Sequence, residues 1–215
     1  MWKSTWKELH ALCQWLHRKA CLGSVEMGKR EITFEVYEKS MIWLLEEMSH
    51  EGMFGRAFMS LTWNLMCRGV NTCVCLKHLM WRADAFGISF SHVKNDPVSS
   101  RNWHPRHFYT NPDNYHVCCV TAVTEYLLCF PQLFQDGNGM LFPGPKQEER
   151  FGAILLCVLE KHKDELLELG YEPNDIGVHS IRKGAGTYAS SGTTAAPSSV
   201  SVNNRGGWVD FGRCM

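Results

Sequence analysis

The sequence has 215 residues, enough for one large domain or two small ones. Apolar residues make up 45% and charged residues 20%, which is typical of a globular core and excludes a disordered chain, a collagen-like fibre and a coiled coil. Basic and acidic residues number 22 each. The net charge of zero, taken alone, argues against a nucleic-acid binder, because such proteins usually have a basic excess.

The charges are unevenly distributed along the chain. Residues 1–30, 54–111 and 176–215 are basic, with net charges of +4, +5 and +3. Residues 31–53 and 112–175 are acidic, with net charges of −5 and −7. We expect the basic blocks to meet in the fold, while the acidic blocks are typical of solvated helix faces.

Neither a membrane span nor a secretion signal is expected. The longest apolar run, residues 153–159, is far too short to cross a bilayer. The N-terminus carries charges where a signal peptide needs an apolar stretch. The sequence therefore predicts an intracellular protein that is not secreted and has no membrane partner.

The ten cysteines, in the absence of a secretion signal, indicate a reducing compartment rather than a disulfide framework. The sequence contains no Cys-x-x-Cys pair, which disfavours a zinc site. Cys73, Cys75 and His78 lie close together, but such a cluster is more typical of small buried side chains. We expect no metal and no other cofactor.

The first third of the chain has helical patterns. Apolar residues recur at three- and four-residue steps over residues 2–22. A second helix is predicted over residues 34–48, with Thr33 as its N-cap. Glycines over residues 52–55 are expected to end it, and a third helix is predicted over residues 57–68.

The pattern then changes to strands. Residues 78–82 and 87–93 flank the short segment 83–86 and predict a β-hairpin. Residues 106–110 predict a third strand. Further helices are expected over 118–130, ended by Pro131, over 148–169, ended by Gly170, over 179–190, and again from about Ser198. The predicted fold class is mostly α with a small antiparallel β-sheet (α+β), the sheet formed by about residues 74–110.

The most informative motif is His179-x-x-Arg182. On a helix, residues three apart lie on the same face. The pair would offer a proton-transfer group beside a guanidinium fork, whose geometry matches two non-bridging phosphate oxygens. Alone, the motif is weak, because ten histidines make a chance match expected.

Three further residues strengthen this motif. Arg68 ends the predicted third helix, Lys94 follows the predicted hairpin, and Trp208 lies downstream of Arg182. Each also has a structural explanation: Arg68 as a cation that complements a helix dipole, Lys94 as a solvated lysine at a strand end, and Trp208 as a core residue. The ordered set is harder to explain by chance than any of its members.

In this order, the set resembles the catalytic residues of the tyrosine recombinases, also called the phage-integrase family. The segments LTWNLMCR (61–68), RHFYTNP (106–112), HSIRKG (179–184) and SGTT (191–194) are similar to the recombinases of Crypton-like and DIRS-like eukaryotic mobile elements. The resemblance covers about residues 33–212, and the order and spacing of its motifs are fairly specific.

The resemblance implies DNA strand cleavage and rejoining. Arg68 and Arg182 would clamp the non-bridging oxygens of the scissile phosphate. Lys94 would protonate the leaving oxygen, His179 would assist proton transfer, and Trp208 would contribute its indole N–H or pack against the phosphate. A covalent phosphotyrosine would conserve the bond energy, so that neither ATP nor a metal is needed.

The sequence departs from the family pattern at three places. The nucleophilic tyrosine is expected about ten residues after Trp208, but the last tyrosine is Tyr188, which we interpret as a packing residue. Asn71 stands where the family often has an acid. Only residues 1–50 are available for the N-terminal DNA-clamping region.

The predicted organisation is therefore a remnant of an N-terminal helical region over residues 1–50. Residues 51–215 would form a recombinase catalytic domain without its final tyrosine-bearing helix, either as a gene-model fragment or as an element relic. The expected partner is double-stranded DNA, with homo-oligomers on DNA as in the family's tetrameric synapse, and the expected location is nuclear or otherwise intracellular.

Two alternatives remain open. The chain could be a domesticated, non-catalytic DNA-binding relic. It could also be a helical protein-interaction domain, which the zero net charge and the acidic segment 160–172 would favour.

Overall fold

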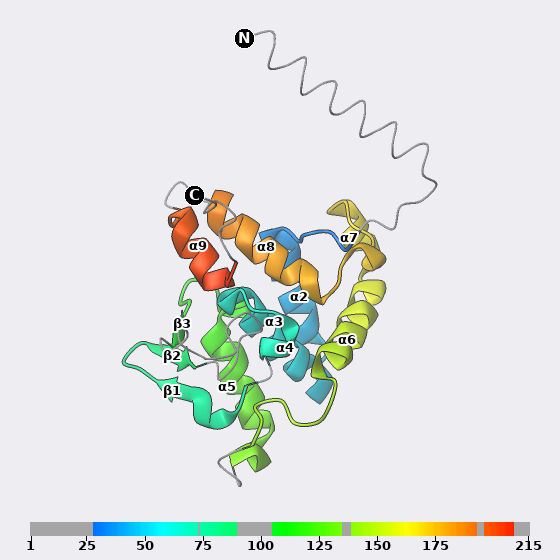
Figure 1. Ribbon diagram of the computed structural model, residues 1–215. Helices are drawn as coiled ribbons and strands as arrows, with labels where there is room; N and C mark the ends of the chain where they lie inside the picture. Colours follow the sequence, from blue (N-terminus) through cyan, green and yellow to red (C-terminus); the bar gives the residue numbers. More distant parts are fainter. Residues whose placement is uncertain (1–27, 73, 90–104, 135–138, 193–195, 209–215) are drawn as a thin grey trace, which may run out of the picture.

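The computed structural model describes residues 28–72, 74–89, 105–134, 139–192 and 196–208. This part of the chain is mostly helical, with one small antiparallel sheet, which confirms the predicted fold class (Figure 1). The predicted helix over residues 2–22 lies outside the described residues. No helix in the described ranges is long and apolar enough to cross a membrane.

Helix α3 (His50–Leu65) is the centre of the fold. Almost all of its residues from Phe54 to Leu65 are buried. Besides the short α4 (Gly69–Thr72) that follows it, it contacts the longer helices α2 (Phe34–Glu46), α5 (Cys119–Cys129), α6 (Gln147–Lys161) and α8 (Val178–Ser191). The shorter helices in the described ranges are α4, α7 (Lys163–Glu168) and α9 (Ser199–Gly206). Four single-turn 3₁₀ helices in the same ranges lie at Leu76–His78, Tyr115–Val117, Pro131–Phe134 and Pro173–Asp175.

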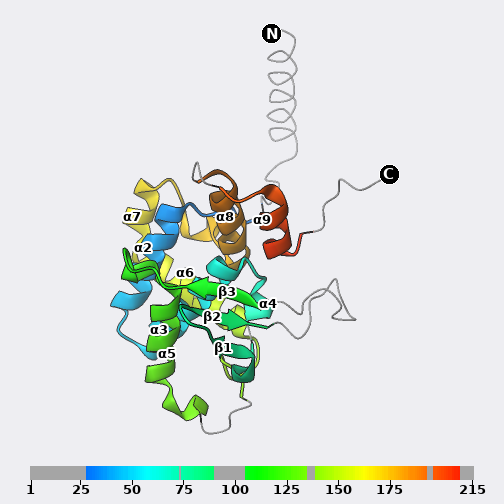
Figure 2. The same cartoon turned by 90° about the vertical axis from the view of Figure 1, so that its left-hand side faces the viewer.

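The sheet consists of β1 (Leu79–Trp81), β2 (Ala85–Ile88) and β3 (Arg106–Tyr109) in that order, all antiparallel (Figure 2). The predicted hairpin and third strand are confirmed, although the second strand begins two residues earlier than expected. Residues 90–93 of the predicted hairpin lie outside the described residues. The sheet contributes Ile88 and Phe108 to the core, and the ring of Phe86 stacks on Phe108 at 5.5 Å.

An aromatic cluster fills the core between α3, α6 and the segment before α6. The ring centroids of Phe58 and Phe151 lie 4.6 Å apart, and those of Phe54 and Phe142 lie 5.2 Å apart. Phe142 has no exposed surface although it lies in a segment rich in glycine and proline. These rings bury a large apolar area, which is the main source of stability in such a core.

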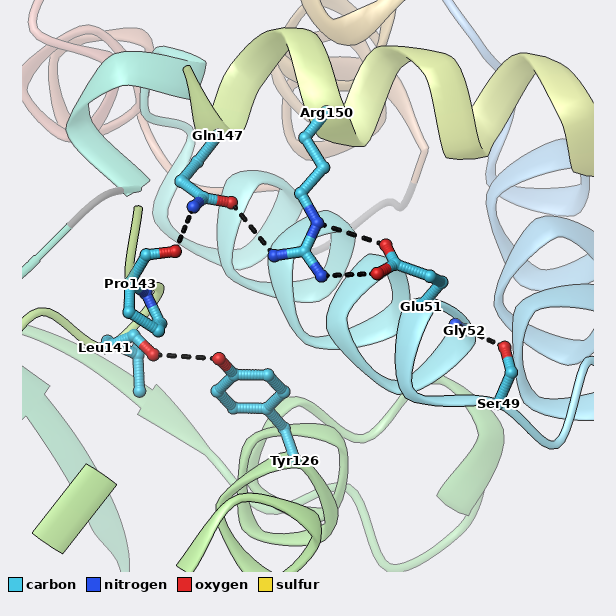
Figure 3. A network of polar contacts seen from close by, with 8 residues as sticks. All are labelled: Ser49, Glu51, Gly52, Tyr126, Leu141, Pro143, Gln147 and Arg150. Atoms are coloured by element: carbon cyan, nitrogen blue, oxygen red, sulfur yellow. Dashed lines mark hydrogen bonds and ion pairs between the residues drawn. The ribbon is translucent and has the colours of Figure 1, made fainter. Parts of the chain in front are cut away.

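Side-chain hydrogen bonds connect the N-terminal ends of α3 and α6 (Figure 3). The Arg150 guanidinium donates to both carboxylate oxygens of Glu51, at 3.1 and 2.6 Å. Arg150 also donates to the Gln147 side chain, which in turn donates to the carbonyl of Pro143. A bidentate arginine–carboxylate pair of this kind fixes relative orientation as well as adding energy.

The expectation that glycines 52–55 interrupt the helical chain is wrong. Helix α3 begins at His50 and runs through both glycines, with Ser49 as its cap: the Ser49 hydroxyl accepts from Gly52 N–H at 3.0 Å. A Cβ at Gly52 would overlap the carbonyl oxygen of Leu44, and one at Gly55 would lie 2.8 Å from Leu44 Cδ2. The two glycines therefore allow α2 and α3 to approach closely.

We predict that Gly52→Ala lowers the free energy of unfolding by about 1–3 kcal/mol, because the added methyl group has no space against the backbone of α2. Gly152→Ala in α6 is the matched control. There the nearest atom to a new Cβ would be Val178 Cγ2 at 3.6 Å, an ordinary contact, so alanine should be neutral or stabilise the helix by up to about 1 kcal/mol. Urea unfolding measures both, and equal effects would contradict this explanation of Gly52.

The single long helix expected over residues 148–169 is also corrected. It is divided into α6 and α7 at His162, whose φ and ψ of −107° and 31° are not helical. The His162 imidazole stacks on Trp43 of α2, with centroids 4.7 Å apart. After this bend, Leu166 is completely buried. The sequence pattern of this acidic segment does not indicate these apolar contacts, which determine where the helix bends.

Candidate functional site

The N-terminal half of α8 forms one wall of a pocket with a volume of about 360 Å³. The helix begins at Val178, and the Ser180 hydroxyl accepts from Gly177 N–H at 3.1 Å at its start. His179 is exposed and Arg182 is half-buried. The residues that line the pocket are Gly28, Lys29, His179, Arg182, Lys183 and Trp208.

Trp208 reaches this pocket from the end of α9. Its backbone N–H donates to Asn203 O at 2.9 Å, and its ring lies 5.1 Å from the Arg182 guanidinium carbon. The ring packs where only glycine fits, because a Cβ at Gly186 or at Gly206 would lie 2.5 Å from it. These two glycines therefore set the position of the indole beside Arg182.

Arg68 follows α3, beyond the left-handed Met66 (φ 48°) that ends this helix. Arg68 and Arg182 are close enough to repel each other. The pKa of Arg182 is lowered, first by burial and then by the charge of Arg68. Arg182 donates to Gly206 O at 2.5 Å, while its buried Nε has no hydrogen-bond partner among the described residues.

The structure thus brings four of the five sequence-predicted residues to one region. His179, Arg182 and Trp208 line the same pocket, and Arg68 lies within electrostatic range of Arg182. Lys94 lies outside the described residues, as does the side chain of Asn71. Tyr188 stacks on Phe34 with centroids 4.8 Å apart and is not among the residues that line the pocket.

Two arginines that were not predicted as site residues hold the end of α3. Arg205 donates to Asn64 O at 3.1 and 2.7 Å and to His107 O at 2.7 Å, and Arg106 donates to Leu65 O at 3.0 Å. The last carbonyls of a helix have no partner within it. Both guanidinium pKa values are lowered by burial. These contacts fix the end of α3, three residues before Arg68.

We predict that Arg205→Met lowers the free energy of unfolding by about 2–4 kcal/mol. The change removes three hydrogen bonds from a charged donor and leaves two carbonyls without it, which is costly for half-buried groups. Chemical unfolding would measure the loss. A variant as stable as the wild type would show that Arg205 does not hold α3 and β3 together.

The Cys67 thiol lies within electrostatic range of Arg106 and Arg182, but it is neutral. Burial raises the pKa of its thiol, an effect that Thr72, Arg106 and Arg182 only reduce. Its sulfur lies 3.3 Å from the Thr72 hydroxyl. Cys67 therefore does not compensate the positive charge of Arg182.

No cluster of three or more metal-ligating side chains occurs in the ranges that the structure describes. Of the cysteine–histidine group noted in the sequence, Cys73 lies outside these ranges, and Cys75 contacts Met140 with its sulfur at 3.5 Å.

No protein-family model and no curated protein sequence matches the chain. Its fold is similar to solved structures of the XerH site-specific recombinase bound to palindromic difH substrate in a post-cleavage complex, and bound to difH substrate in a pre-cleavage complex. Each match has a TM-score of 0.52 at 13% identity and covers 84% of this chain but 47% of the other. The chain thus spans about half the length of these proteins. Its described part has a tyrosine-recombinase-like fold, mostly helical with a small antiparallel sheet.

Proposed function

We propose that this chain is a DNA-binding domain of the tyrosine-recombinase type, whose arginine pocket holds one phosphate of the DNA backbone. The observation that carries this proposal is the state of Arg182. Its guanidinium is half-buried, repelled by Arg68, and makes no ion pair with a carboxylate of the described residues. A half-buried charge without a counter-ion is unfavourable, and a bound phosphodiester would supply one.

In this proposal Arg68 and Arg182 clamp the non-bridging oxygens and so stabilise the charge that develops on them during cleavage. His179 assists proton transfer at the exposed side of the pocket. Trp208 lies over Arg182 and limits where the phosphate can sit. Lys94 would be the general acid for the leaving oxygen.

The similarity to recombinases that were solved with DNA substrates supports this reading at the level of fold. We extend it to a mobile-element recombinase of Crypton-like or DIRS-like type, acting in the nucleus as a homo-oligomer on DNA. The division into a helical remnant at residues 1–50 and a catalytic domain at residues 51–215 is part of the same proposal.

The attacking group is the part of the chemistry that residues 1–215 do not supply. No tyrosine follows Trp208 in them, and Tyr188 stacks its ring on Phe34. We therefore propose that residues 1–215 by themselves bind and clamp the phosphate without forming the covalent intermediate. A domesticated DNA-binding relic would likewise bind DNA without forming a covalent intermediate, whereas a protein-interaction domain would not bind DNA.

We predict that residues 1–215 bind a short duplex with strong salt dependence. Each neutralised phosphate contributes about −0.9 to the slope of log K against log salt concentration, because bound counter-ions are released. Fluorescence anisotropy of a labelled duplex over a series of salt concentrations measures this slope. Absent binding at low salt, or binding that does not change with salt, would favour the protein-interaction domain.

A further inference from the structure

The pocket contains two cations that the clamp of Arg68 and Arg182 does not use. Lys29 comes from the segment before α2, and Lys183 directly follows Arg182 on α8. They are 154 residues apart in the sequence, yet the Lys183 ammonium donates to Lys29 O at 2.8 Å. The fold therefore brings two distant lysines together beside Arg182.

Backbone carbonyls, rather than carboxylates, hold both ammonium groups. Lys29 donates to Asn174 O and Lys183 to Lys29 O, so within the described ranges each lysine uses one of its three N–H donors. Neither makes an ion pair with a carboxylate of the described residues. The pKa of Asp175 is lowered first by the Glu172 N–H and also by Arg30 and Lys29, and its carboxylate already accepts from Arg30 at 3.1 Å and from Glu172 N–H. The lysines are thus positioned but not neutralised.

The segment that carries Lys29 is fixed against α8. Arg30 N–H donates to Asp175 O at 2.8 Å, and Ile32 N–H donates to Ser180 O at 3.4 Å. A Cβ at Gly184 would overlap the backbone of Ile32, so this contact is as close as the chain allows. Lys29 consequently has a set position relative to Arg182 before any ligand binds, which lowers the entropic cost of binding.

The size of the pocket exceeds what one phosphate needs. Its volume of about 360 Å³ lies in the range of small-molecule sites, about 300–1,000 Å³, whereas a phosphate group presents only four oxygens. Arg182 and Trp208 line this pocket together with the two lysines. A planar guanidinium suits bidentate contact, while lysine binds phosphate as a point charge.

We propose that the pocket binds two consecutive phosphates of one DNA strand, one at Arg182 and the next at Lys29 and Lys183. This inference rests on the proposed function and adds a second phosphate subsite to it. The lysines would hold the strand in register while the arginines clamp the reacting phosphate.

The first test compares salt slopes for duplex binding. The double variant Lys29→Gln/Lys183→Gln removes both charges but keeps an amide donor in each side chain. We expect its slope to be smaller than the wild-type slope by about 0.9, the loss of one phosphate contact. Lys163→Gln on α7 is the matched control and should leave the slope unchanged. Arg182→Gln should remove a further contact from the double variant.

The second test counts phosphates. Oligothymidylates with one, two and three internucleotide phosphates are titrated against the protein by NMR. The wild type should gain most affinity between one and two phosphates, and the double variant should lose this gain. A gain that persists in the double variant would overturn the second subsite.

The outcomes separate the two proposals. If no variant or wild-type protein binds DNA, the proposed function fails together with this inference. If Arg182→Gln reduces the slope and the lysine variants do not, only the second subsite fails. Thermal unfolding checks that the double variant is folded; if it is not, Lys29→Gln alone must still reduce the gain between one and two phosphates, and Lys29→Arg must restore it.

Discussion

Replacing Arg182 by methionine is expected to weaken duplex binding by roughly 10- to 100-fold, while the free energy of unfolding changes by no more than about 1 kcal/mol. A charge-assisted hydrogen bond contributes about 1.5–3 kcal/mol, which corresponds to this loss of affinity. The folded protein loses one bond to Gly206 O, but it also loses a half-buried charge that Arg68 repels. Removing this charge also removes the cost of taking it out of water, which offsets the lost hydrogen bond.

Two comparisons make this prediction specific. Arg182→Lys keeps the charge but not the planar fork, and should recover only part of the affinity. Arg205→Met removes an arginine whose partners are backbone carbonyls, and should destabilise the fold instead. Anisotropy and urea unfolding are measured on the same samples. If Arg182→Met unfolds the protein as strongly as Arg205→Met and leaves the affinity unchanged, Arg182 is a structural residue.

Residues 1–215 are expected to form no covalent adduct with a nicked suicide duplex. Adding a C-terminal helix that contains a tyrosine, either in cis or from a partner chain, is expected to produce the adduct. Stabilising the five-coordinate phosphorus does not accelerate cleavage when no group occupies the in-line position. The adduct is detected as labelled DNA that stays with the protein on a denaturing gel. Slow nicking by water is the only cleavage expected without the added segment.

The controls for this experiment distinguish two reasons for the expected lack of an adduct: that residues 1–215 contain no attacking group, or that the phosphate site is degraded. A phenylalanine in place of the added tyrosine, or Arg182→Met in the extended protein, should abolish the adduct. If the extended protein is folded and gives no adduct, the phosphate site has lost its activity, and the relic hypothesis is favoured. An adduct from residues 1–215 alone would show that another residue attacks.

The parts of the fold that sequence could predict are those decided by neighbouring residues. Thr33 caps α2 as expected, because a cap needs only a side-chain oxygen and an N–H three residues on. Helix α9 begins next to Ser198, where the sequence predicts a helix. Gly52 and the bend at His162 depend on contacts with α2, and local propensity contains no information about them. The predictions fail at these two places because tertiary packing, and not local sequence, decides the path of the backbone there.

The candidate site divides in the same way. His179 and Arg182 share a helix turn, so their proximity follows from spacing alone. Lys29 and Arg205, in contrast, are held by hydrogen bonds to backbone carbonyls that are 145 and 141 residues distant in the sequence. Because every residue has a backbone carbonyl, the sequence does not indicate which of them will accept such a bond. The only available signals were the basic character of residues 1–30 and the position of Arg205 in the segment that ends in Trp208.

The most direct test of the phosphate clamp is the salt slope of duplex binding for the wild type and for Arg68→Met/Arg182→Met, measured side by side. Because both guanidiniums are proposed to hold the same phosphate, we predict that the double variant reduces the slope by about 0.9, one phosphate contact. Equal slopes for the two proteins would contradict the clamp, since they would show that duplex DNA binds elsewhere on the molecule.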